Sequence, residues 1–146
     1  EKSPGACTYM RQRGIEHVVE ADLWRYAPEE PFDTVLLIMN GLGLAGTLSD
    51  LPSFFEHVKS WLKPNGQIIF DSSDVSYLYD HNHFPTDRYC GEFRYRLRYK
   101  AILSGWFPWV FVDPSALQKV LNEIDLNWSL RLDGEHYDYG GVLTRQ

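Results

Sequence analysis

The residues with the clearest chemical spacing are three glycines, Gly41, Gly43 and Gly46, arranged as G-x-G-x-x-G. They follow the apolar run Val35 to Met39, which predicts a strand buried on both faces, typical of parallel sheets. In dinucleotide-binding proteins this glycine spacing opens a helix whose free N–H groups bind a pyrophosphate. The pattern therefore admits the NAD(P)-binding half-domain of an oxidoreductase.

Two features of the following residues count against that interpretation. Residues 47–50 carry their own capping chemistry, so the helix begins beyond the last glycine instead of inside the motif. The first acid that ends a strand is Asp71, 30 positions after Gly41, whereas the ribose-binding acid of such proteins is expected about 20 residues on. A loop that leaves a buried strand explains the glycines equally well, and the dinucleotide interpretation stays as an alternative.

Two carboxylates and two aromatic side chains follow the second apolar strand, Gln67 to Phe70. Asp71 and Asp74 stand where the carboxyl end of a parallel strand borders a crevice, which suits a general base. Loop caps and Asx turns within DSSD are the favoured interpretation of these acids. Tyr77 and Tyr79, in the loop that follows, either line a substrate pocket or serve packing.

The same loop is rich in potential metal ligands, namely Asp80, His81, His83, Asp87 and Cys90. A His-x-His pair can bind a transition metal. The spacing fits no established zinc pattern, so we predict a solvated loop and no metal site.

From Gly91 to Val112 the sequence predicts a β-hairpin. Apolar and basic residues alternate, so one strand face carries the four cations Arg94, Arg96, Arg98 and Lys100. A second strand, about Trp106 to Val112, is expected to return antiparallel through a turn at Ser104-Gly105. The cations fit an anionic substrate, although a solvated or salt-bridged face is the favoured interpretation.

The amino-terminal residues predict a helix and a strand. Ser3 and Pro4 form a helix start, with Ser as the N-cap and Pro in the first turn, and Gly14 is the matching stop. His17 to Ala21 reads as a short strand that Asp22 closes.

Two further helices and two strands are predicted downstream. A helix capped by Ser49 or Asp50 and ended by residues 63–66 gathers apolar side chains on one face, those of Leu51, Phe54, Phe55, Val58 and Leu62. Asp113-Pro114 begins another, whose buried face comprises Leu117, Val120, Leu121 and Ile124. The final strands are about Asn127 to Leu132 and Tyr139 to Thr144. These elements predict an α/β sheet with an antiparallel end.

The bulk composition indicates one globular domain over residues 1–146. The chain is 44% hydrophobic and 23% charged, which is ordinary for such domains. Its net charge of −6 argues against nucleic-acid binding. Two cysteines without motif spacing favour a reducing cytoplasm, and no apolar run is long enough to span a membrane. The composition does not predict an oligomeric state.

Several segments together resemble a class I S-adenosylmethionine-dependent methyltransferase. They are SPGA near the start, FDTVLLIMNGLGLAG, the helix ending WLKPNG, the strand QIIFDSSD and the closing strand pair. The resemblance implies a Rossmann-like sheet of order 3-2-1-4-5-7-6, mostly parallel with an antiparallel last strand, and an inserted hairpin over 91–112. Residues 17–21, 34–39 and 67–71 would then match its strands 3, 4 and 5.

The resemblance also implies site residues for S-adenosyl-L-methionine. Glu1 matches the acid that takes the ribose hydroxyls, and Asp22 with Leu23 matches the adenine contact. Asn40, Gly41 and Leu42 match the segment that approaches the methionine portion and the substrate. The catalytic residue is not identified, with Asp71 and Asp74 as candidates, and Tyr77 and Tyr79 are candidates for substrate binding.

The glycine-rich loop after the family's first strand has no counterpart in this sequence. We therefore expect an N-terminally truncated domain in which strand 4 has an uncovered edge and the cofactor binds poorly. The predicted function is methyl transfer to a small-molecule acceptor. The alternatives are the NAD(P)-binding half-domain and a noncatalytic binding or assembly module.

Overall fold

The computed structural model describes residues 1–80 and 83–145. Contacts divide the chain into two compact units, Glu1–Glu30 and Pro31–Gln146. We call these the first and the second unit and describe each by itself. Within the described residues, no helix is both long and apolar enough to cross a membrane.

The first unit contains helix α1, Pro4–Gln12, and its predicted start is confirmed. The Ser3 hydroxyl accepts a hydrogen bond from the Ala6 N–H at 3.3 Å, and Pro4 lies in the first turn. Gly14 follows the helix with φ of +83°, a conformation in which glycine avoids the Cβ strain of other residues.

The predicted strand over His17–Ala21 is wrong, because these residues are not a strand in the structure. In the described chain their backbone bonds to Glu1 and to one side chain: the Ala21 N–H donates to the Glu1 carbonyl at 2.9 Å, the Glu1 ammonium donates to the Val19 carbonyl at 3.2 Å, and the Arg11 guanidinium donates to the Val18 carbonyl at 3.1 Å. A ladder needs a run of backbone partners along a neighbouring strand. One residue's backbone and one side chain do not supply it.

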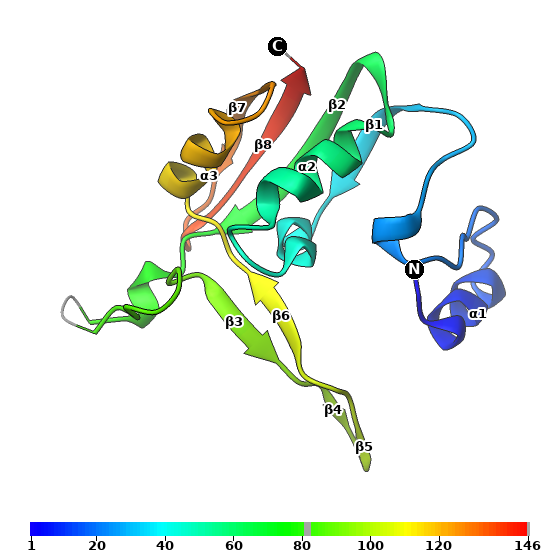
Figure 1. Ribbon diagram of the computed structural model, residues 1–146. Coiled ribbons are helices and arrows are strands. Elements are labelled where there is room, and N and C mark those ends of the chain that lie inside the picture. Colours follow the sequence, from blue (N-terminus) through cyan, green and yellow to red (C-terminus); the bar gives the residue numbers. More distant parts are fainter. Residues whose placement is uncertain (81–82, 146) are drawn as a thin grey trace. The chain divides into compact units, whose positions relative to one another are not determined.

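The second unit is built on a four-stranded sheet of order β1-β2-β8-β7 (Figure 1). Its strands are β1, Phe32–Leu37, β2, Leu62–Ser73, β8, Asp138–Arg145, and β7, Leu126–Asp133. The β1–β2 pair is parallel, whereas β8 runs antiparallel to both β2 and β7. This order and these directions are those of strands 4-5-7-6 in the methyltransferase sheet, so the predicted fold class is confirmed.

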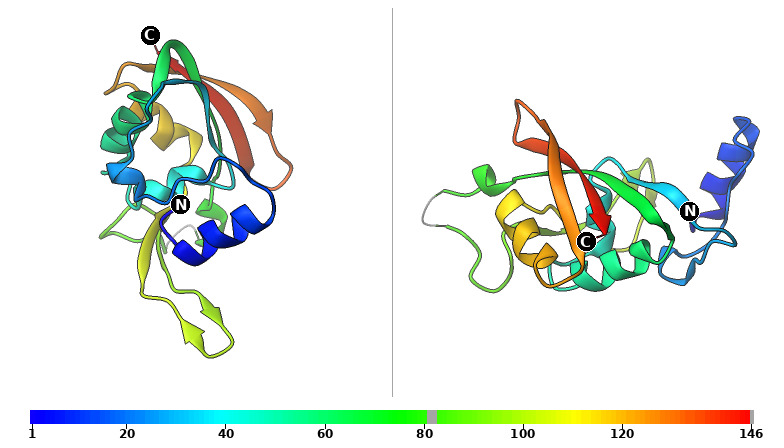
Figure 2. Two further views of the ribbon diagram at one scale, coloured as in Figure 1. Left: turned by 90° about the vertical axis from the view of Figure 1, so that its right-hand side faces the viewer. Right: turned by 90° about the horizontal axis from the view of Figure 1, so that it is seen from above.

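Helices α2, Leu51–Lys59, and α3, Pro114–Leu121, cover the same face of the sheet (Figure 2). Their apolar faces meet alternate residues of the strands, so Ile68, Phe70 and Leu143 are buried. The capping prediction for α3 is confirmed, since the Asp113 carboxylate accepts the Ser115 and Ala116 N–H groups.

Strand β1 is an edge strand of the described chain, and the prediction of a strand buried on both faces is wrong there. Leu37 is buried under the helices, but Leu36 and Ile38 on the other face are exposed. Within the second unit, α2 and α3 lie on the same face, and β2 is the one described strand that pairs with β1.

Helix α2 ends earlier than predicted, and β2 begins earlier. Leu62, predicted on the helix, is the first residue of β2 and pairs with Phe32. The Phe32 N–H donates to the Trp61 carbonyl at 2.7 Å, so the chain leaves the helix to join the sheet. The Arg145 guanidinium donates to the carbonyls of Lys59 and Leu62 at 3.0 and 3.3 Å, which satisfies groups at the helix end.

The predicted hairpin is present, but its turn lies elsewhere. Strand β3, Glu92–Tyr95, pairs with β6, Phe107–Val110, and further out β4, Arg98–Tyr99, pairs with β5, Ile102–Leu103. The tip is therefore Lys100-Ala101, with Lys100 at φ of 52°, not Ser104-Gly105. Two-residue turns with positive φ match the twist of paired strands. Residues 93–109 are called the arm below.

Candidate functional site

The backbone is strained where β1 ends. Met39 and Asn40 are both left-handed, with φ of 61° and 55°, and they turn the chain into the short 3₁₀ helix η2, Gly41–Ala45. Left-handed non-glycine residues persist where the surroundings hold them, and they cluster at functional sites. Met39 is 86% exposed, whereas Asn40 is buried.

Asn40 is held by hydrogen bonds to residues far away in the sequence. Its N–H donates to Asp71 Oδ2 at 3.0 Å, and its side-chain Nδ2 donates to the Val110 carbonyl at 3.1 Å. Its Oδ1 accepts from the Ser72 hydroxyl at 2.9 Å. These contacts fix the loop after β1 to the end of β2 and to the returning strand of the hairpin.

Ser72 and Tyr139 extend these contacts into a buried network. The Ser72 hydroxyl accepts the Val112 N–H at 3.0 Å, and the Tyr139 hydroxyl donates to the Val112 carbonyl at 2.6 Å. Burial raises the pKa of Tyr139 well above its ordinary value, because the charged phenolate is poorly solvated there. We call Asn40, Ser72 and Tyr139 with the backbone of Val110 and Val112 the buried polar network.

Asp71, one of the two carboxylates predicted at the strand end, offers a free acceptor. Its Oδ2 takes the Asn40 N–H, but its Oδ1 is buried and bonds to no donor in the described chain. A buried oxygen without a partner costs about 1–3 kcal/mol. An acceptor oxygen in this position can take a hydrogen bond from an ammonium or hydroxyl donor of a bound molecule.

Asp74, the other carboxylate, makes local contacts. Its Oδ1 accepts the Ser76 N–H at 2.9 Å, and its own N–H donates to the Tyr137 carbonyl at 2.9 Å. This is the Asx turn that the sequence favours for DSSD.

Tyr77 and Tyr79 have packing partners in the structure. Tyr77 stacks on Tyr137 with ring centroids 4.6 Å apart, and more than half of it is exposed. Tyr79 stacks on Phe84 and donates from its hydroxyl to the Cys90 carbonyl at 2.9 Å. Tyr77 thus keeps an accessible ring surface, whereas Tyr79 fastens the loop.

The ligand-rich loop forms no metal site among the residues that the structure describes. His81 lies outside them. Asp80 and His83 are 3.8 Å apart and both exposed, which fits the predicted solvated loop. The Cys90 thiol is free, and burial, followed by the nearby Asp113 and Asp74 carboxylates, raises its pKa.

The first unit holds the remaining residues of the predicted cofactor site. The hydrogen bond from the Ala21 N–H to the Glu1 carbonyl brings the chain segments that carry Glu1 and Asp22 next to each other. The Asp22 carboxylate accepts the Trp24 N–H at 2.9 Å and caps the 3₁₀ turn η1, Leu23–Arg25. Both acids are exposed, as contacts to a ribose and an adenine require.

The glycine triplet has a packing role. A Cβ on Gly43 would overlap the Trp109 indole, and one on Gly41 would lie 2.9 Å from Leu37 Cβ. Gly46 has φ of +89° and faces Pro108. Because α2 begins only at Leu51, no α-helix opens inside the motif; the motif forms only the short 3₁₀ helix η2. Leu42 is fully buried, so a ligand here meets its backbone.

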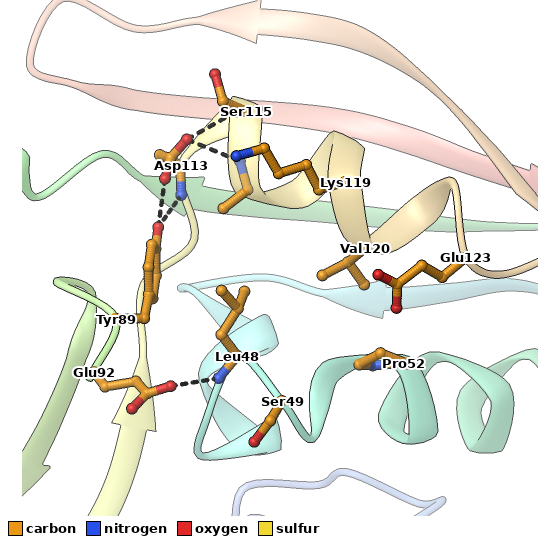
Figure 3. A pocket seen from close by; sticks show the side chains of 11 residues that line it. Leu48, Ser49, Pro52, Tyr89, Glu92, Asp113, Ser115, Lys119, Val120 and Glu123 are labelled. Carbon is orange, nitrogen blue, oxygen red and sulfur yellow. Dashed lines mark hydrogen bonds between the residues drawn. The ribbon is translucent and has the colours of Figure 1, made fainter. Parts of the chain in front are cut away.

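A cavity of about 680 Å³ lies beside α3 (Figure 3). The Tyr89 hydroxyl donates to Asp113 Oδ2 at 2.6 Å and accepts the Asp113 N–H at 2.9 Å. The Glu92 carboxylate accepts the Leu48 N–H at 2.8 Å. Burial and the Asp113 contact raise the pKa of Tyr89 far above its ordinary value, so the phenol stays neutral.

Ser72, Tyr89 and Tyr139 were missed by the sequence interpretation. Ser72 lies within DSSD, next to the predicted carboxylates, and its position in a period-2 strand places it on the buried face. Tyr89 and Tyr139 carry no local signal. Their partners, Asp113 and Val112, are 24 and 27 residues away.

Solved structures provide the comparison with known proteins. The chain is 33% identical to a SAM-dependent methyltransferase from Bacteroides fragilis, solved with S-adenosyl-L-homocysteine, over 98% of this chain and 60% of that one, with a TM-score of 0.86. The CcbJ methyltransferase from Streptomyces caelestis matches all of this chain and 78% of its own at 13% identity and a TM-score of 0.73. An S-adenosylmethionine-dependent methyltransferase from Clostridium acetobutylicum is 14% identical over 99% of this chain and 73% of that one, with a TM-score of 0.67.

No protein-family model matches the chain, and no curated protein matches it. The chain spans 60% of the length of the Bacteroides fragilis protein. The strand order 4-5-7-6, the antiparallel β8 and this similarity agree with one another. From residue 31 onward, the chain has the fold of the class I S-adenosylmethionine-dependent methyltransferases.

Proposed function

We propose that this chain is part of an S-adenosylmethionine-dependent methyltransferase that acts on a small-molecule acceptor. The observation that carries the proposal is the 33% identity, at a TM-score of 0.86, to a methyltransferase solved with S-adenosyl-L-homocysteine. The free, buried Oδ1 of Asp71 at the end of β2 supports it independently, because it supplies an acceptor for a ligand. The glycine packing removes the basis of the NAD(P) alternative.

The residues proposed to hold the cofactor are those that the family resemblance implies. Glu1 takes the ribose hydroxyls, and Asp22 with Leu23 holds the adenine. The backbone of Asn40, Gly41 and Leu42 borders the methionine portion. The bound cofactor supplies the electrophilic methyl group, and the chain's residues orient the acceptor and exclude water.

Asp71 is the proposed residue for the acceptor's proton. Its Oδ1 is buried and free, whereas the Asp74 oxygen is occupied by the Asx turn. A carboxylate at this position accepts a hydrogen bond from an acceptor hydroxyl or ammonium and takes its proton where the acceptor must lose one. Tyr77 provides the accessible aromatic surface beside the loop, and Tyr79 positions that loop.

The acceptor is proposed to be a small molecule. The cavity of about 680 Å³ beside α3 has the size of small-molecule sites, roughly 300–1,000 Å³, but none of the residues proposed for the cofactor, the proton or the acceptor lines it, so it is not the proposed acceptor site. We place the protein in the cytoplasm, which the two free thiols Cys7 and Cys90 support.

Calorimetry tests cofactor binding. The natural protein that contains these residues is titrated with S-adenosylhomocysteine, and binding is expected. Asp22→Asn is expected to weaken it at least about tenfold, because a charge-assisted hydrogen bond contributes roughly 1.5–3 kcal/mol. Asp33→Asn, an exposed acid in an ion pair with Lys63, is the matched control. A folded protein that binds no S-adenosylhomocysteine contradicts the proposal.

Kinetics test the role of Asp71. With an acceptor identified from transfer of labelled methyl groups to a panel of amines, alcohols and thiols, Asp71→Asn is expected to lower kcat about 10²-fold or more. The affinity for S-adenosylhomocysteine is expected to stay within about twofold, because the amide still accepts the Asn40 N–H. Asp74→Asn distinguishes the two carboxylates. An equal loss in both variants argues against Asp71 as the proton acceptor.

A further inference from the structure

The arm exposes an apolar face that nothing in the described chain covers. Leu97, Tyr99 and Ile102 are between 65% and 72% exposed. Tyr99 pairs with Ile102 across the β4–β5 hairpin, so the two side chains lie on the same face. Contiguous exposed apolar side chains of this size mark interaction surfaces.

The other face of the arm is cationic and concave. Arg96, Arg98 and Trp106 line a cavity of about 480 Å³ together with Ala101 and Leu103. The Arg96 guanidinium lies 4.9 Å from the centre of the Trp106 ring, and Arg98 Nε donates to the Lys100 carbonyl at 3.3 Å. Within the described residues, none of the arm's cations is in an ion pair.

The charge of the arm is opposite to that of the rest of the chain. Residues 93–109 contain three arginines and one lysine and no acid, a net charge of +4. The whole chain carries −6, so the remaining residues carry −10. Two arms repel each other, whereas an arm and the remainder of another copy attract each other.

We propose that the arm docks on the acidic remainder of a second copy of this chain. The exchange is reciprocal, as in isologous dimers, so that each copy gives one arm and receives one. Exposed apolar side chains lie on both faces of the arm, Leu97, Tyr99 and Ile102 on one, and Leu103 and Trp106 beside the arginines on the other. The partner is therefore expected to contact both faces, and both faces of two arms contribute to the roughly 1,200–2,000 Å² of a stable interface. The inference does not depend on the methyltransferase proposal.

The molecular mass of the protein in solution tests the proposed dimer. Light scattering after size-exclusion chromatography, at about 50 mM salt where the Debye length is about 14 Å, is expected to give twice the 17.0 kDa of one chain. At about 1 M salt, where the Debye length is about 3 Å, the dissociation constant is expected to rise at least about tenfold. A monomer at low salt and high concentration overturns the proposal.

Two arm variants separate the contributions. Arg96→Glu with Arg98→Glu, and separately Leu97→Ser with Ile102→Ser, are each expected to give monomers. Leu36→Ser is the matched control, since Leu36 is as exposed as Leu97 but lies on β1, and it is expected to stay dimeric. Far-UV circular dichroism checks that each variant is folded, and the salt titration of the unaltered chain needs no variant.

Other results assign the surface differently. A dimer that survives both arm variants, or that Leu36→Ser dissociates, overturns the proposal in favour of association through the β1 edge. A monomer whose tryptophan fluorescence responds to poly-glutamate overturns it in favour of an acidic peptide as the occupant.

Discussion

At the scale of single residues, the left-handed pair Met39 and Asn40 is the feature that shapes the site. Such residues cost of order 1–3 kcal/mol each. Asn40 offsets this cost through its hydrogen bonds to Asp71, Val110 and Ser72, each contributing roughly 0.5–1.5 kcal/mol. Asparagine is also among the few residues that tolerate this conformation. The site is therefore held by long-range polar contacts.

Ser72→Ala is expected to destabilise the second unit by about 2–3 kcal/mol. The change leaves Asn40 Oδ1 and the Val112 N–H without the Ser72 hydroxyl that bonds to both, and a buried polar group that loses its partner costs about 1–3 kcal/mol. Urea unfolding measures the difference. Ser73→Ala, one residue along the same strand and half-buried, serves as control and is expected to change stability by less than about 0.5 kcal/mol.

Tyr139 is expected to make the free energy of unfolding fall as the pH becomes alkaline. Its pKa is raised in the folded state from an ordinary value of 10.0, so below about pH 10 its contribution is fully present. As pH rises above 10, the unfolded chain loses the proton first and stability falls by up to about 1.4 kcal/mol per pH unit.

Urea unfolding at pH 9 and pH 11 checks this dependence on Tyr139. Tyr139→Phe is expected to be less stable at pH 9, because the hydrogen bond to Val112 is lost, and to show a shallower decline toward pH 11. Tyr77→Phe, at an exposed position, is expected to behave like the unaltered chain. An equal decline in all three would contradict the assignment to Tyr139.

At the scale of elements, η2 and β6 are packed so closely that glycine is required between them. Gly43 lies against the Trp109 indole and Gly46 against Pro108. The hairpin thus has its base on the loop that leaves β1. This contact joins the arm to the proposed methyl-transfer site.

Gly43→Ala is expected to destabilise the second unit by about 1–3 kcal/mol, because the new methyl overlaps Trp109. Thermal unfolding measures the change. Gly5→Ala, inside α1 with open space around it, is the matched control and is expected to be neutral or stabilising by up to about 1 kcal/mol. In a Trp109→Leu background, the penalty of Gly43→Ala is expected to shrink, and an unchanged penalty would place the overlap elsewhere.

At the scale of the whole molecule, β1 and β7 are the two edge strands of the described sheet, and β2 and β8 lie between them. The buried core comprises β2, β8 and the two helices that cover them, whereas β1 receives hydrogen bonds along one edge only. Local stability is expected to follow this arrangement.

Hydrogen exchange of residues 1–146 checks the open edge. Alternate amides of β1 that point away from β2 are expected to exchange roughly 100-fold faster than the amides of β2 and β8. Mass spectrometry or NMR at neutral pH resolves the difference. Protection along β1 equal to that of β2 would show that this edge is covered in solution, for instance by a second copy.

Much of the local structure follows from the sequence because its signals are local. Ser3-Pro4 and Asp113-Pro114 begin helices since cap and proline act within one turn. Alternation predicts the hairpin. The family resemblance supplied the strand order, and the acids Asp71 and Asp74 were recognised from their place after a strand.

Tertiary structure alone decided which distant groups meet. His17–Ala21 has strand composition but lacks a run of partners, and Leu62 has helical spacing but pairs with Phe32. The choice between Asp71 and Asp74 depended on which oxygen is free. The hydrogen bonds of the buried polar network span up to 70 residues, the separation of Asn40 and Val110. No local pattern encodes such a hydrogen bond, because its energy depends on burial and on the partner's position.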